Sequence, residues 1–146
     1  MLYTKMSKLS MRIAFNAHKD QVDKSGLPYI FHPFHLAKQM NDETSVCAAL
    51  LHDVVEDTNV TFEDLEAQGI SADVIETLRL LTHTADVPYM DYIQEIKESG
   101  NQSAIAVKLA DLQHNSDVSR LDICNANDKD ILRNKKYMEA INILKC

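Results

Sequence analysis

The chain has 146 residues, of which 45% are hydrophobic and 25% are charged, and its formal net charge is −7. This composition is typical of globular proteins, and the length suits one domain, 1–146, with a sizeable core. The negative charge argues against a general binder of nucleic acid polymers or anionic membranes, because both partners need a basic face. A small phosphorylated ligand stays possible, since a metal ion and a few local lysines can reverse the charge of a site.

The cysteines and the hydrophobic segments indicate a cytoplasmic protein. Cys47, Cys124 and Cys146 are odd in number and lack metal-type spacing, so we expect reduced thiols. No N-terminal apolar core of the signal-peptide kind is present, and no segment approaches the ~20 apolar residues of a membrane span.

The chain contains only three Gly and three Pro, and no stretch alternates apolar and polar residues. This pattern predicts an all-α fold, a single compact domain of about seven to eight helices. From apolar spacing and from breakers such as Gly26, Gly69 and Gly100 we expect helices over 2–18, 33–40, 42–58, 61–69, 71–81, 88–99, 104–115 and 127–145.

Several of these helices begin after a residue that can cap them. Asp42, Ser71 and Ser103 are suitable N-caps, and Thr61 with Asp64 resembles a capping box.

The last predicted helix, 127–145, has an apolar side of its own. We expect its apolar side chains to pack on the core or on a second subunit of a homo-oligomer; they are Ile131, Tyr137, Met138, Ile141 and Leu144.

The most unusual stretch runs from Val46 to Thr58, where an apolar run ends in His52, Asp53, Glu56 and Asp57. In one continuous helix, positions four apart would stack His52 on Glu56 and Asp53 on Asp57. Two stacked carboxylates repel each other, so a nearby divalent cation is the simplest compensation. A solvated acidic helix end is the alternative.

Four residues on or beside apolar helices are candidate metal ligands: His32, His52, Asp53 and Asp111. Mixed imidazole and carboxylate donors suit Mn²⁺, Fe²⁺ or Zn²⁺ better than Ca²⁺ or Mg²⁺. Taken singly, His32 could instead cap its helix, and Asp111 could pair with Lys108.

The order His, His-Asp, Asp resembles the HD superfamily of metal-dependent phosphohydrolases. The chain is most similar to the hydrolase domain of RelA/SpoT-type enzymes and to the stand-alone small alarmone hydrolases. The residues that carry this resemblance are Ala17-His18, Gln21, Lys24-Ser25-Gly26, Pro28-Tyr29-Ile30, His32-Pro33, Ala48 to Asp53, Glu56-Asp57-Thr58, Leu81-Thr82, Lys108 to Asp111 and His114-Asn115.

The resemblance assigns roles to residues of this chain. It implies that His32, His52, Asp53 and Asp111 bind Mn²⁺, and that Glu56 and Asp57 orient or deprotonate the attacking water. It also implies that the nucleotide lies near Lys24, Ser25, His114 and Asn115.

The reaction implied by the resemblance is removal of pyrophosphate from the 3′ position of (p)ppGpp by a metal-bound water. We expect hydrolysis only, because 146 residues leave no room for a synthetase domain. The alternatives are an HD hydrolase of another phosphorylated nucleotide and a non-catalytic nucleotide-binding protein. A further alternative is a structural metal site, in which removal of the metal would unfold the chain.

Four residues differ from the pattern of the alarmone enzymes. Asp23 stands before the Lys-Ser-Gly step where Arg is usual, and Ser116-Asp117 follows His-Asn where Met-Arg is usual. Leu112 also replaces a usual Arg or Lys. These changes remove positive charge where a polyphosphorylated nucleotide would bind it.

Overall fold

The computed structural model describes residues 1–120 and 127–146, and these residues contain helices and no strand. Cys124 lies outside the described residues. The elements are α1 (Lys5–His18), α2 (Phe31–Ala37), α3 (Glu43–Leu51), α4 (Val54–Asp57), α5 (Phe62–Ala67), α6 (Ala72–Leu81), α7 (Tyr89–Ser99), α8 (Gln102–Asn115), the 3₁₀ turn η1 (Val118–Arg120) and α9 (Asp128–Lys145). The predicted all-α class is confirmed.

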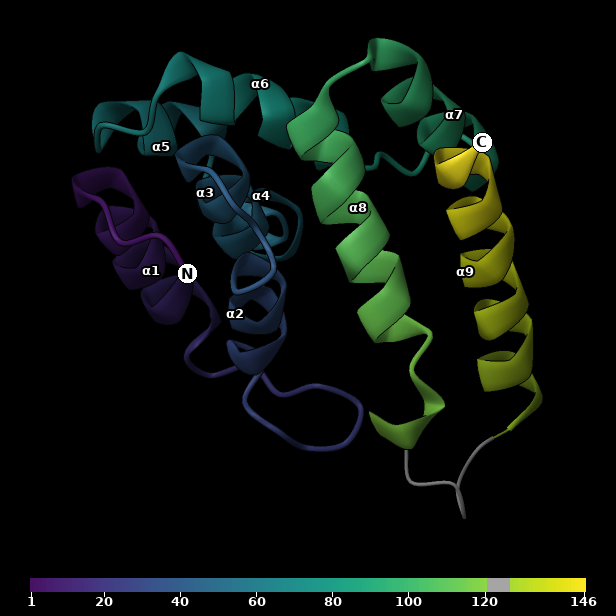
Figure 1. Cartoon of the computed structure of the whole chain (residues 1–146). Coiled ribbons are helices and arrows are strands. Elements are labelled where there is room, and N and C mark those ends of the chain that lie inside the picture. The colour runs from purple at the N-terminus through teal and green to yellow at the C-terminus, as the bar shows by residue number, and fades with distance from the viewer. Residues whose placement is uncertain (121–126) are drawn as a thin grey trace.

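Helix α3 is the centre of the fold. Every residue from Val46 to Leu51 is at most 1% exposed, as expected for a helix that is apolar on all sides. Helices α1, α2, α6 and α8 pack around α3, and α9 covers the outer side of α7 and α8 (Figure 1). The residues at the end of α3 are therefore held in the middle of the molecule.

The predicted single helix over 42–58 is wrong, because the chain turns at His52 and Asp53 between α3 and α4. Neighbouring residues of a continuous helix point about 100° apart. The turn, with Asp53 at φ −103° and ψ −1°, lets both adjacent side chains face the same site. Beyond the turn Asp57 N donates to Asp53 O at 2.9 Å, so the two carboxylates stay one turn apart as predicted.

The predicted caps are mostly present. Asp42 accepts from Ser45 N, and Thr61 and Asp64 form the capping box. Ser71 precedes α6 but its side chain makes no capping bond. At α8 the cap is Asn101 rather than Ser103, since Asn101 accepts from Ala104 N.

Helix α9 packs on the core through fewer residues than its sequence suggested. Ile141 and Leu144 are buried, whereas Ile131 and Met138 remain 56% and 47% exposed. A second subunit on the exposed side stays a prediction.

Cys47 is buried in α3 and Cys146 is exposed, and both are free thiols. Within residues 1–120 and 127–146, no helix is both long and apolar enough to cross a bilayer.

Candidate metal centre

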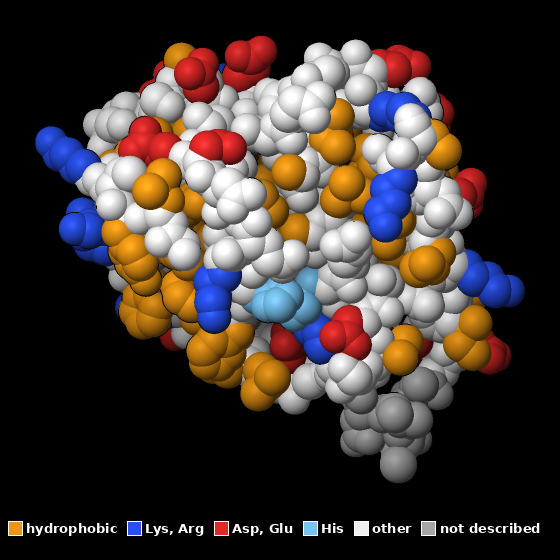
Figure 2. Space-filling model, viewed as in Figure 1, with side chains coloured by type: hydrophobic (Ala, Val, Ile, Leu, Met, Phe, Trp, Pro, Cys, Tyr) orange, Lys and Arg blue, Asp and Glu red, His pale blue; other side chains and the backbone are white. Residues whose placement is uncertain are grey.

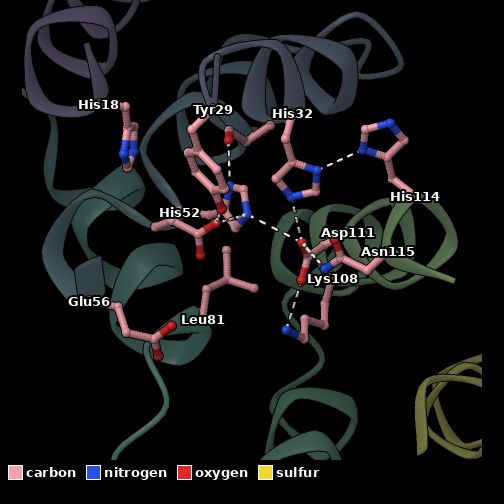
Figure 3. A network of polar contacts seen from close by, with 12 residues as sticks. His18, Tyr29, His32, His52, Glu56, Leu81, Lys108, Asp111, His114 and Asn115 are labelled. Atoms are coloured by element: carbon pink, nitrogen blue, oxygen red, sulfur yellow. Dashed lines mark hydrogen bonds and ion pairs between the residues drawn. The ribbon is translucent and has the colours of Figure 1, made fainter. Parts of the chain in front are cut away.

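Three elements bring the four predicted metal ligands together (Figure 3). His32 comes from α2, Asp111 from α8, and His52 and Asp53 from the turn between α3 and α4. One donor atom of each residue lies within 4.8 Å of the donors of the other three, and all four residues are buried or half-buried. The set that the sequence proposed is thus one compact group of donors.

The spacing of these donors fits a divalent cation. His32 Nε2 lies 2.9 Å from Asp111 Oδ1, and His52 Nε2 lies 2.9 Å from Asp53 Oδ2 and 3.4 Å from Asp111 Oδ1. With metal–ligand bonds of about 2.1 Å, two ligands at a right angle are about 3.0 Å apart. His52 Nε2 is also buried without a well-directed hydrogen bond, although Asp53 is close. An orphaned nitrogen that faces carboxylate oxygens is what a missing cation would leave.

Both histidines hold their second ring nitrogen in a hydrogen bond. His52 Nδ1 donates to the carbonyl of Ala49 at 2.7 Å, which leaves Nε2 to face the centre. His32 Nδ1 lies 2.7 Å from His114 Nδ1. Such outer partners fix the tautomer of a metal-binding imidazole.

The two carboxylates are balanced by buried cations. Lys108 Nζ binds Asp111 Oδ2 at 2.9 Å, so the pairing considered from the sequence exists beside the proposed ligand role. Against the effect of burial, Lys108 holds the pKa of Asp111 well below its usual range. Burial would lower the pKa of His52, but Asp53 and Asp111 raise it well above its ordinary value in the metal-free protein.

Tyr29 is a supporting residue for which no role was predicted. Its hydroxyl donates to Asp53 Oδ2, and its ring lies between those of His18 and His32, with centroids 4.9 and 5.7 Å away. His18 Nδ1 in turn binds Gln21 at 2.9 Å, and Gln21 donates to the carbonyl of Asp57. His18 thus contacts both Gln21 and Tyr29.

Glu56 and Asp57 lie beside the donor group at its solvent side. Their carboxylate oxygens and one of Asp53 lie within 4.8 Å of one another. Glu56 Oε1 accepts from His83 N at 2.8 Å, which fixes the side chain. Burial, followed by Asp53 and Asp57, raises the pKa of Glu56; burial, followed by Asp53, also raises that of Asp57. A carboxylate with a raised pKa is a stronger base.

A cavity of about 640 Å³ opens next to His32. Tyr29, His32, Asn115 and Tyr137 line it, together with the predicted nucleotide contacts Lys24 and Ser25. Its charged lining is Lys24, Arg120, Arg133, Lys135, Asp23, Asp117 and Asp130.

Asp23 and Asp117, two acidic side chains of this cavity, bond to other residues of the chain. Asp23 Oδ1 accepts from Ser25 N and Leu27 N, and its Oδ2 lies 3.7 Å from Arg120 Nη2. Asp117 Oδ1 accepts from the backbone and hydroxyl of Ser119. Asp23 and Asp117, two of the residues that depart from the alarmone pattern, therefore stabilise local turns.

Basic residues from other elements line the same cavity, and two of them are paired with its carboxylates: Arg120 lies 3.7 Å from Asp23, and Arg133 lies 3.1 Å from Asp130. Burial and the nearby Arg133 lower the pKa of Lys24, so the two charges are close. Arg120 and Arg133 were not predicted from the sequence as cavity residues. The residue spacing of η1 and α9 does not indicate that they face the same cavity as Lys24. Loop contacts of this kind have no periodic signal.

Two other predicted nucleotide contacts, Ser25 and Asn115, make hydrogen bonds within the chain. Ser25 donates to the carbonyl of Arg120, and Asn115 Nδ2 donates to Asp111 Oδ1 at 3.1 Å. Burial, then Arg120, His32 and His35, lowers the pKa of His114 to about 4.

Comparison with known proteins agrees with this fold. The HD domain family matches residues 10–118, well over half of the chain. The chain belongs to the HD domain family, as its motifs predicted.

Among curated relatives, a guanosine-3′,5′-bis(diphosphate) 3′-pyrophosphohydrolase named MESH1 from Danio rerio is 31% identical over 141 residues, which cover 89% of this chain and 77% of that protein. The bifunctional (p)ppGpp synthase/hydrolase SpoT of Escherichia coli is 34% identical over 116 residues, which are 70% of this chain but 16% of SpoT. The matched residues thus span only about a sixth of the length of SpoT.

A solved structure described as a metazoan orthologue of SpoT that hydrolyses ppGpp has a TM-score of 0.80 and 23% identity, covering 99% of this chain and 88% of that one. This likeness shows a shared fold.

Proposed function

We propose that this protein is a metal-dependent phosphohydrolase that removes pyrophosphate from the 3′ position of (p)ppGpp. The observation that carries the proposal is the group of donors from His32, His52, Asp53 and Asp111 at the edge of a cavity whose charged lining is four basic and three acidic side chains. The printed activities of the MESH1 and SpoT relatives support the same reaction and substrate.

His32, His52, Asp53 and Asp111 would hold the cation. A bound divalent cation would acidify water and offset phosphate charge, and two imidazoles with two carboxylates suit Mn²⁺, with Fe²⁺ or Zn²⁺ as alternatives. Lys108 limits the negative charge of the donor set by pairing with the outer oxygen of Asp111.

Glu56 and Asp57 are the proposed acid–base pair. Glu56 is fixed by His83 N, and its raised pKa suits proton abstraction from a water near Asp53. Because the two carboxylates interact, one proton can be shared between them as the leaving pyrophosphate departs. Intact water-activating residues favour an enzyme over a nucleotide sensor.

The cavity beside His32 is the proposed nucleotide-binding site. Lys24 and Arg133 can bind phosphate oxygens, and Tyr137 offers an aromatic face to a base. Asp23 and Asp117 accept hydrogen bonds in local turns, and Arg133 lies 3.1 Å from Asp130, so a bound phosphate would share these cations with the local carboxylates. Cytoplasmic location is proposed with the substrate, and the free thiol of Cys47 agrees with a reducing compartment.

The test is hydrolysis by the purified protein with Mn²⁺ of a panel of ppGpp, pppGpp, ppApp and nucleoside mono- and triphosphates. We expect turnover of ppGpp and pppGpp, lost in Asp53→Ala while circular dichroism stays unchanged. Turnover of another nucleotide but not of ppGpp would refute the alarmone assignment. Unfolding of the wild type by chelation alone would instead indicate a structural metal.

A further inference from the structure

The side chains of three histidines form one contiguous group at the contact between α2 and α8. His32 and His35 are three residues apart on α2, and Asp111 and His114 are three residues apart on α8. Both pairs therefore lie on one face of their helix, and the two faces meet. Figure 3 shows the ring of His114 pointing at that of His32, on the side away from Asp111.

The contact between His32 and His114 has the geometry of a hydrogen bond. Their Nδ1 atoms are 2.7 Å apart, and the ring planes differ by 8°. A proton on the line between the two nitrogens thus lies in the plane of both rings, where the nitrogen lone pair points. One nitrogen must donate and the other must accept.

The second ring nitrogen of His32, Nε2, determines which histidine donates in this hydrogen bond. His32 Nε2 faces Asp111 Oδ1 at 2.9 Å and belongs to the donor group. If Nε2 offers its lone pair to a cation, a neutral imidazole carries its proton on Nδ1. His32 is then the donor and His114 Nδ1 the acceptor.

His114 is itself held in place from two sides. The ring of His35 stacks on its ring with centroids 4.1 Å apart, and Arg120 Nη1 donates to its carbonyl at 2.8 Å. His35 is exposed, and histidine surface comes to the outside at the lower centre of the face in Figure 2, beside acidic and basic side chains. The group therefore runs from the surface to the buried donor set.

We propose that His114 is a positioning residue of the metal centre, which accepts a hydrogen bond from His32 Nδ1 and so presents the Nε2 lone pair of His32 to the cation. This role differs from the nucleotide contact that the sequence resemblance implied. The residues that line the cavity include His32 and Asn115 but not His114, and Nδ1 of His114 is already occupied by His32.

The inference rests on the proposed metal site and not on the substrate, so its test is metal binding without nucleotide. Mn²⁺ affinity of the full chain is measured by calorimetry for wild type, His114→Phe and His114→Gln. Phe keeps an aromatic ring without an acceptor, whereas Gln keeps an acceptor oxygen. Loss of an outer partner of a metal-binding histidine typically weakens metal affinity about 10- to 100-fold.

We expect this loss for His114→Phe and recovery of most of the affinity for His114→Gln. His35→Phe is the matched control, because it keeps the stacked ring and leaves the hydrogen bond intact; its affinity should stay within about twofold of the wild type. Wild-type affinity in His114→Phe, with only a raised KM for nucleotide, would overturn the inference and restore the substrate contact. No metal binding by the wild type would refute the proposed function itself.

A second measurement needs no variant and covers the case in which His114→Phe does not fold. Long-range ¹H–¹⁵N spectra of the wild type with Zn²⁺ report which ring nitrogen carries each proton. The inference requires His32 protonated on Nδ1 and His114 protonated on Nε2. His32 bound through Nδ1, or His114 protonated on Nδ1, would contradict it.

Discussion

Lys108 provides a sharp test of the electrostatic design of the centre, through the substitution Lys108→Met. Its Nζ lies 2.9 Å from Asp111 Oδ2, and its side chain is 13% exposed while that of Asp111 is 7% exposed. Methionine keeps the length of the side chain but leaves the Asp111 carboxylate without its main cation. Breaking a buried ion pair by removing one partner costs about 3–5 kcal/mol.

We expect a loss near the lower limit, about 3 kcal/mol, because Asp111 Oδ1 keeps His32 and Asn115 as partners. For a chain of this size, that loss lowers Tm by about 6–12 °C. The assay is thermal and urea unfolding of the metal-free protein, followed by circular dichroism. In saturating Mn²⁺ the difference from the wild type should shrink, since a bound cation takes over part of the charge balance.

Lys136→Met is the matched control. Lys136 is exposed, with Nζ 4.1 Å from the centre of the Tyr89 ring, and exposed cation–π contacts contribute at most about 1 kcal/mol. The reasoning is refuted if metal-free Lys108→Met is as stable as Lys136→Met, or if Mn²⁺ widens the difference from the wild type.

Three further predictions address the base, the cavity and the donor set. Glu56→Gln should lower kcat by about 100-fold or more while calorimetric Mn²⁺ affinity stays within a fewfold; unchanged kcat would remove Glu56 from the mechanism. Arg133→Met should raise KM for ppGpp about tenfold with little change in kcat, because one charge-assisted phosphate contact is lost. The control is Lys129→Met, an exposed position outside the cavity, which should leave KM unchanged. Equal effects of the two substitutions in steady-state assays would contradict a specific contact of Arg133. Asp53 and Asp111 raise the pKa of His52 in the metal-free protein, so Mn²⁺ competes with a proton at this site and should bind more weakly as the pH falls. Calorimetry in buffers of different ionisation enthalpy measures the proton release, and proton uptake on binding would contradict this prediction.

Periodicity and breakers located most helices, because apolar spacing reflects burial directly. The sequence could not show that α3 ends before His52, since propensity allows a continuous helix and only the convergence of His52 and Asp53 with Asp111 explains the turn. Local electrostatics at Asp53 and Asp57 pointed to the stretch whose His52 and Asp53 lie beside His32 and Asp111, because like charges so close need compensation.

The limits of prediction are clearest around the nucleotide cavity. From the sequence, Asp23 appeared only as the loss of the usual Arg at this position. Its contacts with Ser25 N and Arg120 join a loop and a 3₁₀ turn that lie far apart in sequence. Arg133 faces the same cavity from α9. A single sequence carries no record of such long-range neighbours, so substrate recognition was harder to predict than the metal donors.

The central claim is that a cation held by His32, His52, Asp53 and Asp111 supports release of pyrophosphate from (p)ppGpp. The most direct measurement is a ³¹P NMR time course of ppGpp with metal-depleted protein to which Mn²⁺ is restored. We expect GDP and pyrophosphate in equal amounts, with no reaction in EDTA or with Asp53→Ala. Unchanged ppGpp with Mn²⁺ bound, or stepwise release of orthophosphate, would contradict it.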